Sequence, residues 1–185
     1  LHGFRSSPQS HKAQAMAAFM AQHYPQVHWW CPQLPPSPQA AMDQVLQGTL
    51  DWPKGQTVVI GSSLGGFYAQ CFAAVTGCRA VLLNPAVEPA RDLDHVGLQQ
   101  AWHDPSQSFY FQPDYVDQLT QLQSTLQAAR AETFAIVAQG DEVLRWEEMV
   151  SHLPQARIKL LPGSDHALSD FDEHRSDILD FLNLA

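Results

Sequence analysis

The sequence predicts a protein of the α/β class, in which a mostly parallel sheet carries helices on both faces. Short apolar runs that suit buried strands alternate along the chain with longer runs of helical periodicity. Glycine, proline and small polar residues separate most of these runs, as expected of turns. The chain has 185 residues, of which 45% are hydrophobic, and a chain of this length can bury a substantial core. We therefore expect one domain over residues 1–185.

The expected strands are short and rich in apolar residues. In chain order they are the end of a strand at Leu1–Phe4 and the runs Val27–Cys31, Thr57–Ile60, Ala80–Leu83, Phe134–Ala138 and Arg157–Leu161. Most of these runs are continuous in hydrophobicity, which is typical of parallel strands buried on both faces. Residues that follow such strands gather at the carboxyl edge of the sheet, where open α/β sheets place their sites.

The expected helices lie between the strands. They cover Ser10–His23, Pro38–Leu50, Leu64–Thr76, Pro113–Ala129 and Arg145–His152, and a last helix runs to Leu182 from a cap at Ser169 or Asp170. Pro38 suits a first helical turn, where its missing N–H is not needed. Gly77 suits the position just beyond a helix end, which often has a left-handed backbone.

Residues 84–132 interrupt the alternation, because prolines and aromatic side chains are frequent there. One interpretation is a surface insertion with its own local packing. The other is a small cap-like insertion that lines an acyl pocket, since long segments of this kind are often functional. On the second interpretation, the candidate substrate-binding residues are Trp102, Phe109, Tyr110 and Phe111.

The run from Gly61 to Gly65 fits the pattern G-x-S-x-G, with Ser63 at its centre, directly between an expected strand and an expected helix. In a nucleophile elbow, the central serine stands on a strained turn, and its small neighbours let strand and helix approach closely. The first N–H groups of the helix then face a developing oxyanion. An ordinary glycine- and serine-rich loop has the same letters, but the flanking strand and helix favour Ser63 as a nucleophile.

A serine nucleophile needs a base, and the base needs an orienting carboxylate. Asp141 follows the strand that ends at Ala138, and His166 follows the strand that ends at Leu161. The chain order Ser63, Asp141, His166 is the order found in hydrolases with a nucleophile elbow. We therefore predict that these three residues form a catalytic triad.

Two other carboxylates could serve as the acid. Asp165 is next to His166 in the sequence, so we expect its side chain to point elsewhere. Glu142 is next to Asp141, and we expect it to act as a cap or to pair with Arg145.

The turn His2-Gly3-Phe4 can complete the site. After a strand beside the elbow strand, it can aim the Phe4 N–H at the carbonyl oxygen of a substrate, with the Leu64 N–H as the second donor. Each such donor is worth about 2.7–4 kcal/mol of the barrier. The alternative is that His2-Gly3 is only a tight turn.

Composition excludes several classes of partner. The formal net charge is −9, which argues against nucleic acid, because phosphate contacts depend on lysine and arginine. No apolar run approaches the roughly 20 residues of a membrane span. Three cysteines, Cys31, Cys71 and Cys78, cannot all pair within the chain, and their spacing matches no zinc pattern, so we expect buried thiols in a reducing compartment such as the cytoplasm.

We expect neither a metal nor an organic cofactor. A metal site formed by His95, His103 and Asp104 stays open as an alternative, although the spacing fits no standard pattern. The oligomeric state does not follow from the sequence.

Taken together, these motifs resemble the small bacterial YqiA-like esterases of the α/β-hydrolase superfamily. The resemblance covers nearly the whole chain and rests on an ordered set of segments: Leu1–Phe4, Ser6–Pro8, Lys12–Ala13, Pro32–Pro35, Ile60–Ala69, Asn84–Val87, Pro89, Gly140–Leu144 and Gly163–His166. It implies a compact hydrolase of carboxylic esters or acyl thioesters that uses the triad above. A non-catalytic binding protein on the same fold is the less favoured alternative.

The resemblance also implies a strand before Leu1. In this superfamily, the strand that ends in His-Gly lies inside the sheet, between Val27–Cys31 and the elbow strand. We therefore expect the natural protein to carry a short apolar run upstream of Leu1.

Overall fold

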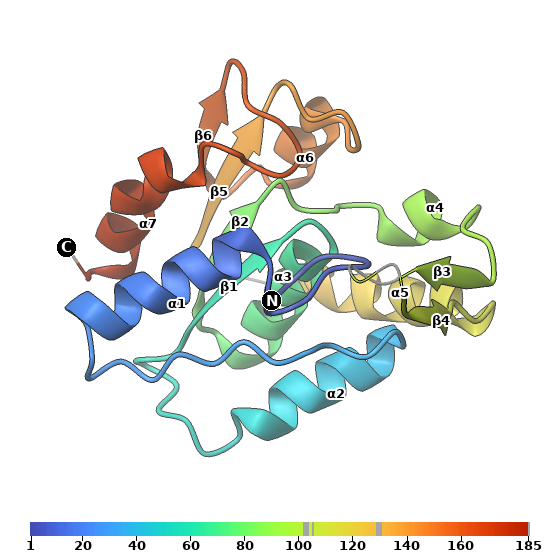
Figure 1. Cartoon of the computed structure of the whole chain (residues 1–185), viewed down its shortest axis with the longest axis horizontal. Coiled ribbons are helices and arrows are strands. Elements are labelled where there is room, and N and C mark those ends of the chain that lie inside the picture. Colours follow the sequence, from blue (N-terminus) through green and yellow to red (C-terminus); the bar gives the residue numbers. More distant parts are fainter. Residues whose placement is uncertain (102–103, 105, 129–130, 185) are drawn as a thin grey trace.

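The central feature of the computed structural model is a four-stranded parallel sheet (Figure 1). The structure describes residues 1–101, 104, 106–128 and 131–184. The strands lie in the order β1-β2-β5-β6, with bounds β1 Val58–Ser62, β2 Arg79–Leu83, β5 Thr133–Ala138 and β6 Arg157–Leu161. All three neighbouring pairs are parallel. This sheet confirms the predicted α/β class.

The strands end close together, because their registers align them. Ser62 lies opposite Leu83 at the end of β1 and β2, and Ala138 lies opposite Leu161 at the end of β5 and β6. Each residue that follows a strand therefore emerges at the same edge of the sheet.

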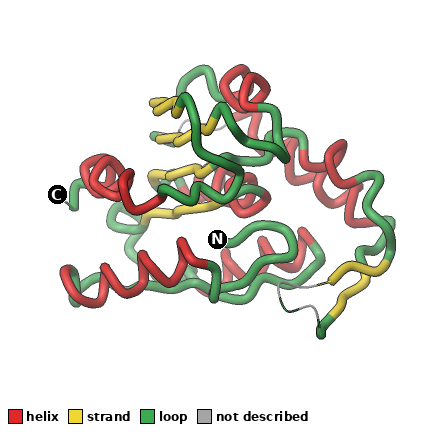
Figure 2. The backbone as a smooth tube through the Cα atoms, turned by 45° about the horizontal axis from the view of Figure 1, so that its top comes forward, coloured by secondary structure: helices red, strands yellow, loops and turns green. Residues whose placement is uncertain are grey.

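Helices cover both faces of the sheet, as Figure 2 shows. One face carries α1 (His11–His23) and α7 (Arg175–Leu182), which follows a 3₁₀ turn at Phe171–His174. The other face carries α3 (Leu64–Thr76) and α6 (Trp146–His152), with α2 (Pro38–Gly48) packed in the same core. Strand β2 explains the division: Ala80 and Leu82 belong to one core, and Val81 and Leu83 to the other, as the alternation of side chains along a strand requires.

The described parts of residues 84–132 form a group of small elements beside the sheet (Figure 1). They are α4 (Pro89–Leu93), β3 (Gln99–Ala101), β4 (Ser108–Tyr110), α5 (Asp114–Ser124) and a 3₁₀ turn at Thr125–Ala128. Strands β3 and β4 pair antiparallel with each other and form a sheet of their own. The expected helix at Pro113–Ala129 is thus shorter, and its last part is 3₁₀.

The prediction of a strand at Val27–Cys31 is wrong. Within the described residues, no backbone hydrogen bond joins this segment to β1, and a cavity of about 110 Å³ lies between them. A β-type composition is not sufficient for a strand, because a strand also needs a neighbour that supplies the hydrogen-bonded ladder.

The expected strand end at Leu1–Phe4 is only partly correct. Leu1 lies alongside β1, since its amino group donates to Ile60 O at 2.5 Å and its carbonyl accepts from Ser62 N at 3.1 Å. The chain then turns, and Ser6 N donates to Gly3 O at 3.2 Å. An apolar strand upstream of Leu1 stays a prediction.

In the part of the chain that the structure describes, no helix combines the length and the apolar character needed to cross a bilayer.

Candidate active site

Ser63 stands on the sharp turn between β1 and α3. Its φ of 55° and ψ of −124° lie in a region that residues with a side chain rarely adopt. Glycines on either side allow the turn: a Cβ added at Gly61 would lie 2.0 Å from Gly65 O, and one added at Gly65 would lie 2.3 Å from Leu1 O. The pattern G-x-S-x-G therefore has the steric role that the sequence predicted for it.

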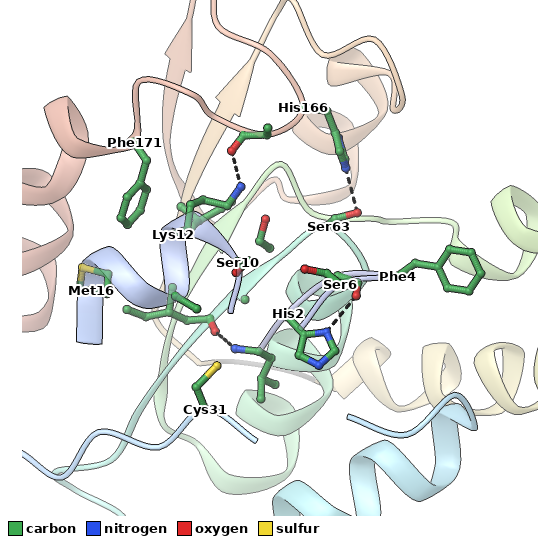
Figure 3. A pocket seen from close by; sticks show the side chains of 18 of the residues that line it. His2, Phe4, Ser6, Ser10, Lys12, Met16, Cys31, Ser63, His166 and Phe171 are labelled. Carbon is green, nitrogen blue, oxygen red and sulfur yellow. Dashed lines mark hydrogen bonds between the residues drawn. The ribbon is translucent and has the colours of Figure 1, made fainter. Parts of the chain in front are cut away.

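His166 lies between Ser63 and Asp141. Its Nε2 is 3.0 Å from Ser63 Oγ, and its Nδ1 is 2.7 Å from an Asp141 carboxylate oxygen. The Asp141 side chain is fully buried, and 19% of the His166 side chain is exposed. Figure 3 shows the imidazole of His166 directed at the Ser63 hydroxyl. The structure thus brings the three predicted residues into one hydrogen-bonded chain.

The second oxygen of Asp141 fixes the orientation of its carboxylate. It accepts hydrogen bonds from Val143 N at 2.8 Å and Leu144 N at 2.7 Å. Because a carboxylate oxygen can only accept, His166 Nδ1 is assigned the proton, and Nε2 is left to accept the hydroxyl proton of Ser63. In this arrangement His166 can act as a base toward Ser63.

The two rival carboxylates bind elsewhere. Asp165 accepts hydrogen bonds from the backbone N–H and the hydroxyl of Ser169, at 2.9 and 2.6 Å. Glu142 accepts from the backbone N–H of His166 at 3.0 Å. The expected pairing of Glu142 with Arg145 is wrong, because Arg145 approaches Glu148 instead, at 3.7 Å.

The Phe4 and Leu64 amides lie on the two segments that meet at Ser63. Leu64 is the first residue of α3, and a Cβ added at Gly3 would lie 3.1 Å from Ser63 Cβ. Neither N–H donates a hydrogen bond within the described residues, as required of donors kept for a ligand. The His2 ring holds this turn in place, because its Nε2 accepts from Leu34 N at 2.9 Å.

The predicted substrate-binding aromatics take different positions. Phe109 and Phe111 are buried, and their rings meet the Phe4 ring edge to face, with centroids 5.8 and 5.6 Å away. Tyr110 lies on the opposite side of β4 and is 63% exposed. Trp102 lies outside the described residues.

Two cavities adjoin Ser63 or its neighbours. One of about 190 Å³ is lined by Ser63 and His166 together with side chains from α1, among them Lys12 and Met16 (Figure 3). A narrow one of about 20 Å³ lies beside Phe4 and is lined by Leu64, Tyr68 and Phe109 among others. The first turn of α3 and the start of the 84–132 segment are in contact beside the site, since a Cβ added at Gly66 would lie 2.8 Å from Pro85 Cβ and Ala86 N donates to Ser63 O at 3.0 Å.

Of the three cysteines, Cys71 and Cys78 are buried, whereas Cys31 is only partly buried and lines the same cavity as Ser63. Burial raises the pKa of Cys71 to about 12, with a smaller opposing effect from hydrogen bonding to Thr125, so its thiolate is scarce at neutral pH. Burial also raises the pKa of Cys78. Among the described residues, no group of three or more histidine, cysteine or carboxylate side chains could hold a metal ion; His103, part of the alternative metal site, lies outside them.

Solved structures share this fold. Est1E from Butyrivibrio proteoclasticus, solved with ferulic acid bound, superposes with a TM-score of 0.73 at 15% identity, covering 100% of this chain and 86% of that one. The mouse α/β hydrolase domain-containing protein 10 superposes with a TM-score of 0.69 at 13% identity, covering 98% of this chain and 88% of that one. A monoacylglycerol lipase from Paleococcus ferrophilus superposes with a TM-score of 0.64 at 13% identity, covering 100% of this chain and 93% of that one. At these identities the likeness establishes the α/β-hydrolase fold.

The sequence itself also matches a family model. The model of the uncharacterised protein family UPF0227, the YqiA-like family, matches residues 1–183, which is nearly the whole chain. The resemblance inferred from the motifs is therefore confirmed, and the chain belongs to the UPF0227 family of α/β-hydrolase-fold proteins.

Proposed function

We propose that this protein is a serine hydrolase that cleaves carboxylic esters through an acyl-enzyme. The observation that carries the proposal is the hydrogen-bonded chain Asp141–His166–Ser63, with distances of 2.7 and 3.0 Å. The esterase and lipase names of several structural neighbours agree with it. A binding protein has no need for three such side chains at three separate strand ends.

In the first half of the reaction, Ser63 Oγ attacks the carbonyl carbon of the ester while His166 Nε2 takes the hydroxyl proton. Asp141 holds the imidazole in the correct tautomer and stabilises the imidazolium. The Phe4 and Leu64 N–H groups bind the oxyanion of the tetrahedral intermediate. Collapse of this intermediate breaks the bond to the alcohol, which leaves with the proton from His166.

In the second half, water attacks the acyl-enzyme and gives a proton to His166. The second tetrahedral intermediate then releases the carboxylic acid and restores the Ser63 hydroxyl. These steps need no metal and no organic cofactor. An acyl thioester can react by the same steps, with a thiol as the leaving group.

The position of Phe109 and Phe111 against Phe4 supports a role in contacting an apolar acyl group. The three cysteines are free, which agrees with a reducing compartment, and we infer that the protein acts in the cytoplasm on small-molecule substrates.

A fluorophosphonate probe tests the proposal directly. We expect the probe to phosphonylate the protein once, to map to Ser63 by peptide mass spectrometry, and to leave Ser63→Ala unmodified. A protein that binds esters without cleaving them would not be labelled. Matched oxyesters and thioesters of increasing acyl length would then establish the preferred substrate.

A further inference from the structure

The main chain around His166 is held by side chains from three other parts of the fold. Asn84 Nδ2 donates to Asp165 O at 3.0 Å and to His166 O at 3.2 Å. Glu142 accepts from His166 N at 3.0 Å. Lys12, on α1, donates to Ala167 O (Figure 3).

Asn84 is suited to this position in both conformation and chemistry. It follows β2 with a φ of 41°, a left-handed value that asparagine tolerates better than most residues. Its Oδ1 accepts from Ala138 N at 2.8 Å, and its backbone N–H donates to Ile136 O at 3.0 Å. The side chain is completely buried, and it joins the end of β2, the end of β5 and the His166 loop.

The loop itself does not adopt a relaxed path. Ser164 and Leu168, on either side of His166, both have positive φ, at 66° and 49°, which is costly for residues with a side chain. Gly140 is in close contact with the same loop, since a Cβ there would lie 2.2 Å from Ser164 O. Such a path persists only where the surroundings fix it.

We propose that Asn84 and Glu142 are positioning residues, which hold the backbone C=O and N–H of His166 so that the imidazole lies between Asp141 and Ser63. Glu142 fixes the N–H of His166, and Asn84 fixes its C=O. The inference rests on the proposed function, because it concerns the placement of the base in that reaction. Displacement of a reacting group by about 1 Å can cost on the order of 10²-fold in rate.

Glu142 offers the cleaner test, because its side chain is exposed and its replacement should not disturb the core. We expect Glu142→Ala to lower kcat by about 10- to 100-fold with KM changed less than about twofold, since the substrate contacts remain. Glu142→Gln should restore most of kcat, because its amide oxygen can still accept from His166 N–H. Glu147→Ala is the matched control: Glu147 is exposed on α6 and has no ion pair or side-chain hydrogen bond within the described residues.

Asn84→Ala should reduce kcat more strongly, by about 10²-fold or more, because it removes both bonds to the His166 loop. The proton NMR signal of the His166 Nδ1–H shared with Asp141 gives an independent readout. We expect this signal to broaden or shift in Asn84→Ala and Glu142→Ala, and to be unchanged in Glu147→Ala. If Asn84→Ala does not fold, the comparison of Glu142→Ala with Glu142→Gln still decides whether a hydrogen bond to the His166 backbone positions the base.

The rate of fluorophosphonate labelling at Ser63 separates this inference from the proposed function. If the wild-type protein is not labelled at Ser63, the proposed function fails. If the wild type is labelled and Glu142→Ala reacts and turns over within about twofold of it, the positioning role is overturned. A Glu142→Gln variant as slow as Glu142→Ala would also overturn it, because the hydrogen bond would then not be the cause.

Discussion

Two segments flank the candidate site, and they are held in different ways. The His166 loop, residues 162–168, is fixed by side-chain hydrogen bonds from Lys12, Asn84 and Glu142. The β3–β4 ribbon, which carries Phe109, forms strand pairs only with itself within the described residues. Its Phe109 ring meets the Phe4 ring edge to face, and one side-chain hydrogen bond, from Arg5 Nε to Ala101 O at 2.9 Å, joins β3 to the N-terminal turn. Several directional bonds thus fix the loop that carries the proposed base, whereas Phe109, proposed to contact the substrate, is held mainly by apolar packing.

The difference suggests a division of function. Proton transfer needs a donor and an acceptor within a few tenths of an ångström of a fixed position, and hydrogen bonds from several elements supply that precision. An apolar acyl group needs only a complementary surface, and contacts between aromatic rings tolerate changes in shape better. We therefore expect substitutions in the first segment to change kcat, and substitutions in the second to change KM and chain-length preference.

The largest effect should come from Ser63. We expect Ser63→Ala to lower kcat by on the order of 10⁶-fold, because the nucleophile and the base act as one unit, while the thermal unfolding temperature stays close to that of the wild type. Steady-state hydrolysis of a chromogenic ester measures the change. Ser62→Ala is the matched control, and similar losses in both variants would contradict the assignment of Ser63.

The second-largest loss of kcat should come from substitution of Asp141. Asp141→Asn is expected to lower kcat by about 10⁴-fold, because an amide favours the wrong tautomer of His166. The same assay on Asp165→Asn provides the comparison, since Asp165 binds Ser169 instead. A greater loss in Asp165→Asn than in Asp141→Asn would show that the wrong carboxylate has been chosen.

The parts of the site that follow from strand order could be predicted from the sequence. Ser63, Asp141 and His166 each come shortly after a buried run, and parallel strands bring such positions to one edge whatever their separation along the chain. The role of the elbow glycines could also be predicted from the G-x-S-x-G pattern. The structure agrees, because no larger residue fits at these positions between β1 and α3.

The supporting contacts could not be predicted in this way. Glu142 lies close to Arg145 in the sequence, but Arg145 approaches Glu148 instead, and Glu142 accepts from His166 N, a partner 24 residues away that only the fold brings close. Asn84 reads as a turn residue before a proline, whereas its partners lie 54 to 82 residues away and depend on the register of β2 and β5. Val27–Cys31 has strand composition, yet its conformation depends on a neighbour that the sequence of the segment does not specify.

Substitutions of Phe109 and Tyr110 test the role of the β3–β4 ribbon. Phe109 is 8% exposed and Tyr110 is 63% exposed, so the pair differs mainly in which side of β4 each residue occupies. We expect Phe109→Ala to lower the free energy of unfolding by roughly 3–5 kcal/mol, as for other buried phenylalanines, and to alter the preferred acyl length. Tyr110→Ala should change stability by no more than about 0.5 kcal/mol.

Chemical denaturation and an acyl-chain series measure these two properties. Equal stability losses in both variants would show that the ribbon does not pack on the core through Phe109. An unchanged chain-length preference in a folded Phe109→Ala variant would remove the 84–132 segment from substrate selection.

The smallest effect concerns Asp170, which supports the His166 loop from outside. Asp170 accepts hydrogen bonds from the Ser164 hydroxyl at 2.5 Å and from His174 at 3.2 Å. Burial on its own would raise the pKa of this carboxyl, but the hydrogen bonds from Ser164 and His174 outweigh burial and hold the pKa below its ordinary value of 3.8. A carboxyl with a lowered pKa in the folded state stabilises the protein above its unfolded-state pKa, and this contribution is lost as the pH falls through the folded-state pKa.

Asp170→Asn should therefore lower the free energy of unfolding at pH 7 by less than about 1 kcal/mol, because the side chain is one-third exposed and water screens its charge. The difference from the wild type should shrink as the pH falls below about 4, near the ordinary pKa of aspartate, because the wild-type carboxyl then begins to lose its own charge. Urea denaturation at pH 7 and at pH 3 measures both values. A difference that stays constant across this range would show that the charge of Asp170 does not support the loop, and that Ser164 needs only a neutral acceptor there.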